Sequence, residues 1–319
     1  MSGMMRTHPR VAIHMRAGLG DAAVMSTKLR GIRDAHPHAL IRCYLNSPRP
    51  EVVRPLLDAS PYLDEVRPTP YSRPLAVGTE RAIRTWADGG PFYHLDVLPR
   101  GASADAEQRT IEYIHPEIPF DPAPEVNFPD EVERWADGLE AECRAGDRLL
   151  VGCHLHAIHG RPAEEDPTRF KEWGRAQWQR LADLLGEDRP CRILLFGGPR
   201  DNWDVPTGLH VRNLIGWITV VQSLALVRRL DVLVGVDSGL KSCSLIFGVP
   251  TVMLWDARNP DPRECWFPAY YQQLDRNAIF TTTASADDVF DFVQARLPEP
   301  AGRAAADPGN PTSTRRSAC

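Results

Sequence analysis

The fold class of this chain can be inferred from Leu230-Asp-Val-Leu-Val-Gly-Val-Asp-Ser-Gly-Leu240 and the residues that follow it. An apolar run ends in Asp237-Ser238-Gly239, a helix-like segment follows as far as Phe247, and the next apolar run starts at Pro250. Strand, tight turn, helix and strand in this order are typical of one unit of a parallel sheet. The stretch therefore predicts an α/β fold.

The turn that ends the first apolar run is a candidate phosphate site. A parallel sheet presents its working surface at the carboxyl ends of its strands, where helix N-termini point free N–H groups. These groups and the helix dipole attract phosphate. Gly239 lets the backbone approach a ligand, Ser238 can cap the helix and donate its hydroxyl, and Lys241 adds a cation. We therefore expect Asp237 and these three residues to bind a phosphorylated ligand.

The same alternation of apolar runs and helical spacing occurs in both halves of the chain. Strands are expected at 10–15, 40–45, 62–66, 92–97, 149–155, 192–196, 230–236 and 250–255. Helices are expected at 22–35, 52–57, 130–143, 177–185, 220–229, 241–247 and 287–297. Two such series predict two Rossmann-like domains, with parallel sheets that face an interdomain cleft.

The domain boundaries follow from changes in composition. We expect the first domain over residues 1–145 and the second over residues 146–297. Residues 298–319 repeat Pro, Gly, Ala and Ser with few large apolar residues, which predicts a disordered tail. The irregular, proline-rich stretch 67–128 is expected to form loops and helices that shape a substrate cleft.

Composition excludes several classes of protein. With 319 residues, 43% of them hydrophobic and 25% charged, the chain is long enough for two globular domains. A formal net charge of -5 argues against a general nucleic-acid binder. The seven cysteines are widely spaced and form no Cys-x-x-Cys motif, which favours reduced thiols over disulfides or structural zinc.

The expected location is the cytoplasm. The sequence has no apolar run long enough for a transmembrane helix, and its N-terminus lacks the apolar core of a signal peptide. This composition is compatible with peripheral association at the inner face of a membrane. It says nothing about the oligomeric state.

Asp21 is the candidate general base. It follows Gly18-Leu-Gly20 at the expected end of the first strand, where a carboxylate faces the expected cleft. Such a carboxylate can accept a proton from an attacking hydroxyl, and its alternative role is to cap the following helix. Arg16 precedes the same turn and can hold an anionic acceptor by a forked contact, or pair with a local acid. We expect Arg16, Gly18 and Gly20 on the acceptor side.

Two residues of the second half are candidates for contacts with the nucleotide of a donor. Asp201, in the turn Gly197-Gly-Pro-Arg-Asp201, can accept hydrogen bonds from ribose hydroxyls or serve only as a turn residue. Lys171 lies in the loop after the strand expected at 149–155, where a lysine can neutralise diphosphate charge or remain solvated.

Three histidines, His154, His156 and His159, could suggest a metal site. On a strand, His154 and His156 share a face, a spacing compatible with metal binding. No acidic or cysteine partner is placed convincingly for them in the sequence. We therefore expect no metal and assign His154 to the lining of a nucleotide site.

Several of these stretches together resemble glycosyltransferase family 9, the ADP-heptose:lipopolysaccharide heptosyltransferases. The resemblance rests on Ala17-Gly-Leu-Gly-Asp-Ala-Ala-Val24, Phe170-Lys-Glu-Trp173 and Val234-Gly-Val-Asp-Ser-Gly-Leu240. It extends to Ile193-Leu-Leu-Phe-Gly-Gly-Pro199, Asn213-Leu-Ile-Gly216 and Gly248-Val-Pro-Thr-Val-Met-Leu254. The order of these motifs holds across both expected domains.

The resemblance implies a GT-B fold, with an acceptor-binding domain first and a nucleotide-sugar-binding domain second. It implies inverting transfer of a heptose or related sugar from ADP-heptose to a hydroxyl of a lipopolysaccharide-like glycan, without a cofactor or a required metal. By position, Asp21 resembles the catalytic base, Lys171 the diphosphate-binding lysine and Asp201 the acid near the ribose. The phosphate loop corresponds to Asp237, Ser238, Gly239 and Leu240.

The chain also departs from the family pattern, which leaves alternatives open. The family has a histidine two or three residues past the Asp-Ser-Gly turn, where this chain has Lys241-Ser-Cys243. Lys241 either takes over charge neutralisation there or accompanies a different donor. Residues 67–128, which should select the acceptor, match nothing in the family. The acceptor can therefore be a glycan, a protein or a small molecule. A non-catalytic nucleotide-sugar-binding protein and a nucleotide-sugar epimerase are the competing classes, and joint retention of Asp21, Lys171 and Asp237 favours the transferase.

Overall fold

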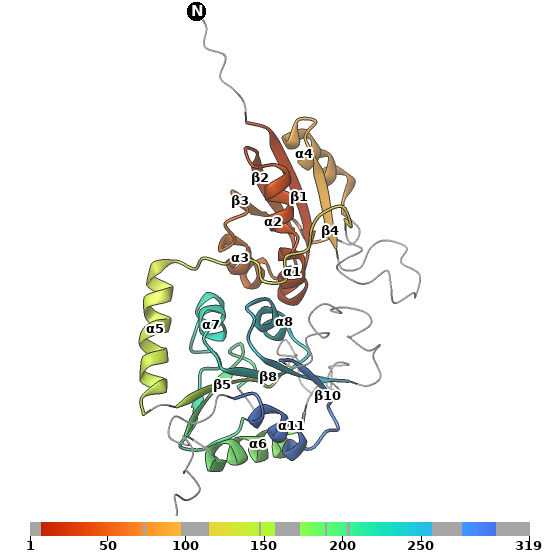
Figure 1. Cartoon of the computed structure of the whole chain (residues 1–319). Coiled ribbons are helices and arrows are strands. Elements are labelled where there is room, and N and C mark those ends of the chain that lie inside the picture. The colour runs from red at the N-terminus through yellow and green to blue at the C-terminus, as the bar shows by residue number, and fades with distance from the viewer. Residues whose placement is uncertain are drawn as a thin grey trace, which may run out of the picture.

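The fold consists of two parallel sheets, one in each half of the chain (Figure 1). The computed structural model describes residues 8–72, 75–96, 115–146, 148–156, 173–188, 190–202, 205–256 and 276–297. The four-stranded first sheet has the order β3-β2-β1-β4, and the six-stranded second sheet has the order β10-β9-β8-β5-β6-β7. Every strand pair in both sheets is parallel. The expected α/β fold is therefore confirmed.

The strands coincide with or overlap the apolar runs of the sequence. The first sheet contains β1 (Arg10–Arg16), β2 (Leu40–Asn46), β3 (Glu65–Pro68) and β4 (Phe92–Asp96). The second contains β5 (Leu149–His154), β6 (Cys191–Phe196), β7 (Val211–Asn213), β8 (Val232–Val236), β9 (Thr251–Trp255) and β10 (Ala278–Thr281). The short edge strands β7 and β10 are absent from the sequence-based expectation.

Helices connect the strands of each sheet. The first half contains α1 (Leu19–Ser26), α2 (Leu29–Ala35), α3 (Pro50–Asp58) and α4 (Val77–Ala87). Further along the chain, the described residues form α5 (Asp130–Arg144), α6 (Arg175–Asp188), α7 (Val220–Val227), α8 (Gly239–Ile246) and α11 (Ala286–Gln294). Within the part of the chain that the structure describes, none of the helices is both long and apolar enough to cross a membrane.

One expected helix is divided in the structure. The spacing over residues 22–35 predicts a single helix, but α1 ends at Ser26 and α2 begins at Leu29. The hydroxyls of Ser26 and Thr27 donate to the carbonyl oxygens of Ala23 and Val24, at 2.6 and 2.5 Å. Such bonds to the preceding turn bend helices and compete with their continuation.

The two faces of the first sheet have different coverings. Val11, Ile13 and Met15 alternate along β1 and are buried in the main core, together with residues of α1, α2 and α3. The opposite face carries Ala12 and Tyr44, which pack in a separate cluster with residues of α4. The period-two alternation of a strand thus assigns His14 and Arg16 to the α4 face.

The two sheets meet through helices rather than through strands. The main core is one continuous cluster that extends from α1 and α3 into α7 and α8. Figure 1 shows α1 directly above α8, and these two helices are in extensive contact. At the contact, a Cβ added to Gly20 would lie 3.3 Å from the Cα of Gly239. The first turn of α1 therefore packs against the first turn of α8.

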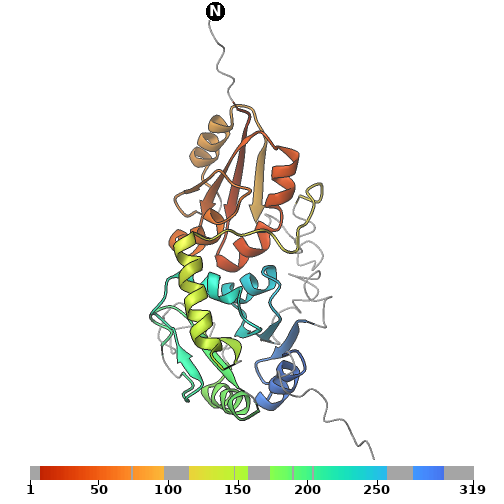
Figure 2. The same ribbon diagram turned by 60° about the vertical axis from the view of Figure 1, so that its left-hand side comes forward.

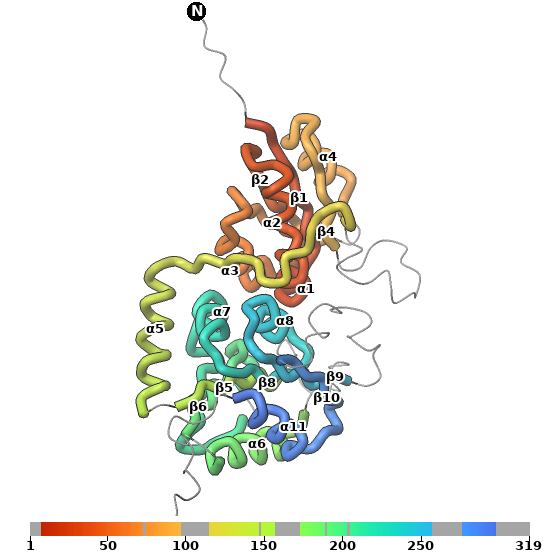
Figure 3. The backbone as a smooth tube through the Cα atoms, in the orientation of Figure 1, coloured from red at the N-terminus to blue at the C-terminus, as the bar shows by residue number. Residues whose placement is uncertain are grey.

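The connection between the sheets runs along the first half before it enters the second. Lys28 Nζ donates to the carbonyl of Ile118 at 2.8 Å, and the N–H of Asn127 donates to the carbonyl of Ala59 at 2.7 Å. Figure 3 shows this segment passing α1 and α3 before it turns into α5. Figure 2 shows α5 itself alongside the second sheet.

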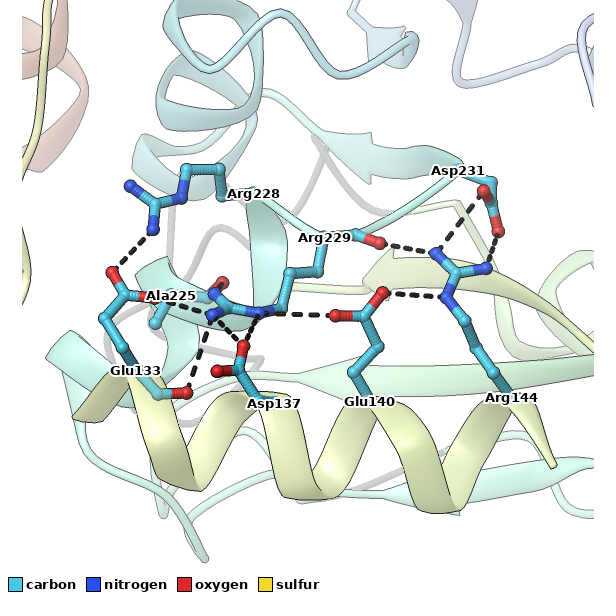
Figure 4. A network of polar contacts seen from close by, with 8 residues as sticks. All are labelled: Glu133, Asp137, Glu140, Arg144, Ala225, Arg228, Arg229 and Asp231. Carbon is cyan, nitrogen blue, oxygen red and sulfur yellow. Dashed lines mark hydrogen bonds and ion pairs between the residues drawn. The ribbon is translucent and has the colours of Figure 1, made fainter. Parts of the chain in front are cut away.

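Ion pairs link α5 to residues 228–231, which follow α7 (Figure 4). Glu133 and Asp137 lie one turn apart on α5, and both contact Arg229, at 2.6 and 2.5 Å. At the end of the same helix, Arg144 pairs with Asp231 at 2.8 Å. Arg229 is largely buried, so these contacts are screened less by water than an exposed pair. Helix α5 is therefore held to the second sheet.

A methyl group at Gly239 is predicted to disturb the junction between the two sheets. Its Cβ would lie 2.8 Å from Leu19 Cβ and 3.0 Å from the nitrogen of Gly20, so the backbone must shift. We expect Gly239→Ala to lower the free energy of unfolding by about 1–3 kcal/mol in urea denaturation.

The control is Gly138→Ala on the exposed face of α5. A Cβ there meets no atom within 4 Å. The change is expected to raise stability by about 0.5–1 kcal/mol, because alanine loses less backbone entropy than glycine in a helix. A Gly239→Ala variant as stable as the unmodified protein would contradict the close contact.

Candidate functional site

The strand order of the second sheet predicts a ligand site at the carboxyl ends of β5 and β8. These neighbouring strands are the point at which the order reverses, and ligands of open α/β sheets bind at the carboxyl ends of strands at such a point. His154 ends β5, and Asp237 and Ser238 follow β8. His154 Nδ1 lies 2.8 Å from Ser238 Oγ, so the two strand ends are joined by a hydrogen bond.

Ser238 is the N-cap of α8, as its position in the sequence predicts. Its Oγ accepts a hydrogen bond from the backbone N–H of Lys241, at 3.4 Å. The hydroxyl thus contacts both His154 and the first turn of α8. Gly239 and Leu240 are the first two helical residues, whose N–H groups have no intrahelical acceptor. The helix start therefore offers donors toward an anion.

Lys241 is a fully buried cation in the first turn of α8. A positive charge at a helix N-terminus opposes the helix dipole, and burial removes its hydration. The Asp237 carboxylate offsets both costs, because its Oδ1 lies 3.3 Å from Lys241 Nζ. The two residues form an i,i+4 ion pair beneath the turn.

Asp21 stands at the corresponding position of the first half, in the first turn of α1. Its Oδ2 accepts a hydrogen bond from the backbone N–H of Gly18 at 3.0 Å, so the capping role is present in the structure. Asp21 adjoins Gly20, and Gly20 packs on Gly239. The structure therefore brings Asp21 and the Asp237 turn to the same junction.

Asp201 closes the turn after β6. Its Oδ2 accepts from the backbone N–H of Gly198 at 2.7 Å, and its own N–H donates to the carbonyl of Gly198 at 2.9 Å. The turn packs against Gly216, which adopts a φ of +74° and approaches the backbone of Pro199. Asp201 thus has the turn role considered for it, at the same edge of the sheet as Asp237.

The remaining residues considered for donor or metal binding are Lys171, His156 and His159. Lys171 and His159 lie outside the described residues. His156 is buried beyond the end of β5. Within the described ranges, no group of three or more His, Cys, Asp or Glu side chains is arranged to hold a metal ion.

Arg16 is ion-paired in the first sheet. It ends β1, lies opposite Asp96 of β4, and its Nη2 is 2.7 Å from Asp96 Oδ2. One step back in the same register, His14 lies opposite His94, with 3.0 Å between their Nδ1 atoms and their rings stacked. Sequence reasoning missed His14, His94 and Asp96, although their period-two spacing on the two strands is visible in the sequence.

Burial lowers the pKa of His14 from its ordinary value of 6.5 to about 4. The neighbouring His94 and Arg16 also lower it, whereas Asp96 and Glu80 raise it. His14 is therefore a neutral imidazole at neutral pH, with one N–H donor and one acceptor nitrogen. The unfolded chain takes up this proton near pH 6.5.

The lowered pKa of His14 predicts a loss of stability in acid. Between pH 6.5 and about 4 the unfolded state binds more protons at His14 than the folded state does. The contribution of His14 to the free energy of unfolding is therefore complete above pH 6.5 and is lost as the pH falls toward 4. His14→Gln should remove up to about 3 kcal/mol of that pH dependence, measured by urea denaturation across the interval. The exposed His38, changed to Gln, is the control. Identical pH profiles for the unmodified protein and His14→Gln would contradict the assignment.

Comparison with known proteins identifies related folds. Residues 156–277 match the model of glycosyltransferase family 9 (heptosyltransferase). No curated protein sequence matches the chain. The glycosyl transferase family 9 protein from Veillonella parvula DSM 2008 is 16% identical, with a TM-score of 0.64 over 92% of this chain and 98% of that one.

Two enzymes of Escherichia coli have similar structures. ADP-heptose LPS heptosyltransferase II is 16% identical, with a TM-score of 0.64 over 90% of this chain and 98% of that one. Heptosyltransferase WaaC, solved with ADP-2-deoxy-2-fluoro heptose, is 14% identical, with a TM-score of 0.56 over 89% and 99%. At these identities the likeness shows the fold, which is the expected GT-B arrangement of two parallel α/β units. The matched region 156–277 includes the Asp237 turn and α8, and the chain is a glycosyltransferase that carries the family 9 domain.

Proposed function

We propose that the protein is an inverting transferase that moves a heptose, or a related sugar, from ADP-heptose to a hydroxyl of a lipopolysaccharide-like glycan. The observation that carries this proposal is the contact between the first turns of α1 and α8, with Asp21 on one side and Asp237 on the other. An inverting displacement needs an activated hydroxyl on one side of the sugar carbon and a stabilised leaving group on the other. The two turns supply one requirement each.

The donor diphosphate is assigned to the start of α8. The N–H groups of Gly239 and Leu240 and the hydroxyl of Ser238 would donate to its oxygens, and the positive end of the helix dipole attracts its charge. Lys171 would add positive charge, whereas Lys241 is buried and paired with Asp237 and would support the turn from behind. His154 holds Ser238 in place through its 2.8 Å hydrogen bond, and Asp201 would accept from the ribose. In this proposal no cofactor or metal takes part.

The acceptor is assigned to the first half, beside Arg16, Gly18 and Gly20. As its oxygen bonds to the anomeric carbon, its proton passes to Asp21 and the bond from that carbon to the ADP oxygen breaks. The electron pair leaves with ADP, whose charge meets the start of α8. A single displacement inverts the configuration and needs no covalent intermediate. The reaction is placed in the cytoplasm, at the inner membrane face when the acceptor is lipid-linked.

Asp21→Asn tests the base. Asparagine keeps an oxygen that accepts from the Gly18 N–H, so the helix cap and ADP affinity are expected to persist. It cannot take a proton, so turnover should fall by about 100-fold or more, measured as ADP release from ADP-heptose with acceptor. Asp34→Asn, at an exposed position of α2, is the control. Unchanged turnover in Asp21→Asn would remove Asp21 from the mechanism.

Calorimetry with ADP, GDP and UDP tests the donor assignment. ADP should bind most tightly, and Lys171→Ala should weaken ADP binding by about tenfold, because the lost ammonium neutralises diphosphate charge. Arg180→Ala is the matched control, since Arg180 is an exposed cation on α6 paired with Asp287. Preference for UDP, or an ADP affinity unaffected by Lys171→Ala, would count against the corresponding assignment.

A further inference from the structure

A polar layer lies at the point where the strand order of the first sheet reverses. In the order β3-β2-β1-β4 this point falls between β1 and β4, whose carboxyl ends are the expected ligand edge of such a sheet. There the register pairs His14 with His94 and Arg16 with Asp96. Asn46 of β2 flanks Arg16 on its other side. We call these five residues the polar layer.

The layer contains a buried nitrogen atom that has no hydrogen-bond partner among the described residues. His14 has no exposed surface, and its Nδ1 is engaged with His94. Its Nε2 is buried and has no hydrogen-bond partner among the described residues. The Oγ of Ser72 is also buried and has no hydrogen-bond partner among the described residues. The backbone N–H and carbonyl of Ser72 are hydrogen-bonded to the side-chain amide of Asn46. An unsatisfied buried polar atom costs free energy, which a hydrogen bond to a ligand hydroxyl would recover.

The charges in the layer balance one another. Asp96 is buried and its carboxylate holds the Arg16 guanidinium at 2.7 and 2.9 Å. An acidic ligand at Arg16 would have to approach this carboxylate or displace it, and both options cost electrostatic energy. A neutral sugar avoids that cost, because its hydroxyls donate to the carboxylate and accept from the guanidinium, amide and imidazole groups.

The layer is close to the proposed base. Arg16 precedes Gly18 by two residues, a backbone distance of at most about 7 Å. The N–H of Gly18 is in turn 3.0 Å from Asp21 Oδ2. The layer and Asp21 therefore lie near the same end of β1, on either side of the short turn that follows Arg16. His94, with 40% of its side chain exposed, provides access.

We infer that the polar layer selects the acceptor by binding the hydroxyl groups of a neutral sugar residue, in preference to an acidic sugar or a phosphate. This inference rests on the proposed function, because it identifies the layer with the acceptor side of that reaction. It assigns Asp96 as the specificity-determining residue, since its carboxylate both accepts from sugar hydroxyls and cancels the charge of Arg16.

The test is binding of simple sugars to the full chain without any donor. Methyl glycosides of glucose, galactose, mannose and a heptose are compared with the matching uronides and with glucose 6-phosphate, by NMR of ¹⁵N-labelled histidine side chains. At least one neutral glycoside should shift the imidazole signals of His14 and His94, and should bind more tightly than its acidic counterpart. No shift with any glycoside, or tighter binding of the acidic sugars, would overturn the inference.

Asp96→Asn should change the preference between the neutral glycoside and the uronide, which a purely structural role of Asp96 does not predict. The neutral asparagine side chain removes the carboxylate charge that contacts Arg16, so affinity for the neutral glycoside should fall by about tenfold while affinity for the uronide rises. If this variant does not fold, His94→Gln is used, and it should weaken the neutral glycoside without favouring the uronide. Equal affinities in the variant that folds and in the unmodified protein would overturn the assignment.

ADP calorimetry on the same sample separates the two proposals. ADP binding without any response to sugars rejects the layer assignment and leaves the donor assignment intact. A response to neutral sugars without ADP binding rejects the proposed transferase and leaves a neutral-sugar site in the first sheet.

Discussion

The contact between Gly20 and Gly239 sets how closely the two halves of the chain approach each other. With no side chain at either position, the first turns of α1 and α8 approach until a Cβ on Gly239 would lie 3.0 Å from the Gly20 nitrogen. Two helix N-termini, each preceded by the carboxyl end of a parallel strand, then share one region. Asp21 and Asp237 belong to that region because each lies within two residues of the contact. The continuous core through α1, α3, α7 and α8 holds the arrangement.

The two sheets present different chemistry at equivalent places. In each sheet the strand order reverses at one pair of strands, β1 with β4 and β5 with β8, and polar side chains join the strand ends there. The second sheet offers the N–H groups of a helix N-terminus, which suit a diphosphate. The first offers a balanced Arg16–Asp96 pair beside a neutral imidazole, which suits hydroxyl groups. The division between donor and acceptor proposed above follows from this difference.

Local patterns in the sequence predict much of this architecture, and long-range pairing accounts for what they miss. The apolar run into Asp237-Ser238-Gly239 predicts strand, cap and helix, and the structure contains β8, the Ser238 cap and α8. The break between α1 and α2 depends on hydroxyl bonds of Ser26 and Thr27, which apolar spacing does not reveal. The polar layer requires β1 to pair with β4, about 80 residues away, in one particular register. No local rule supplies that register.

A crystal structure of the protein with ADP would show whether the starts of α1 and α8 form one site. The account predicts the diphosphate at the start of α8, with its oxygens accepting from the N–H groups of Gly239 and Leu240. It also predicts that the Asp21 carboxylate lines the same solvent-filled space, on the opposite side from the phosphates. A diphosphate bound away from α8, or an Asp21 carboxylate on a surface that does not border the nucleotide, would contradict it.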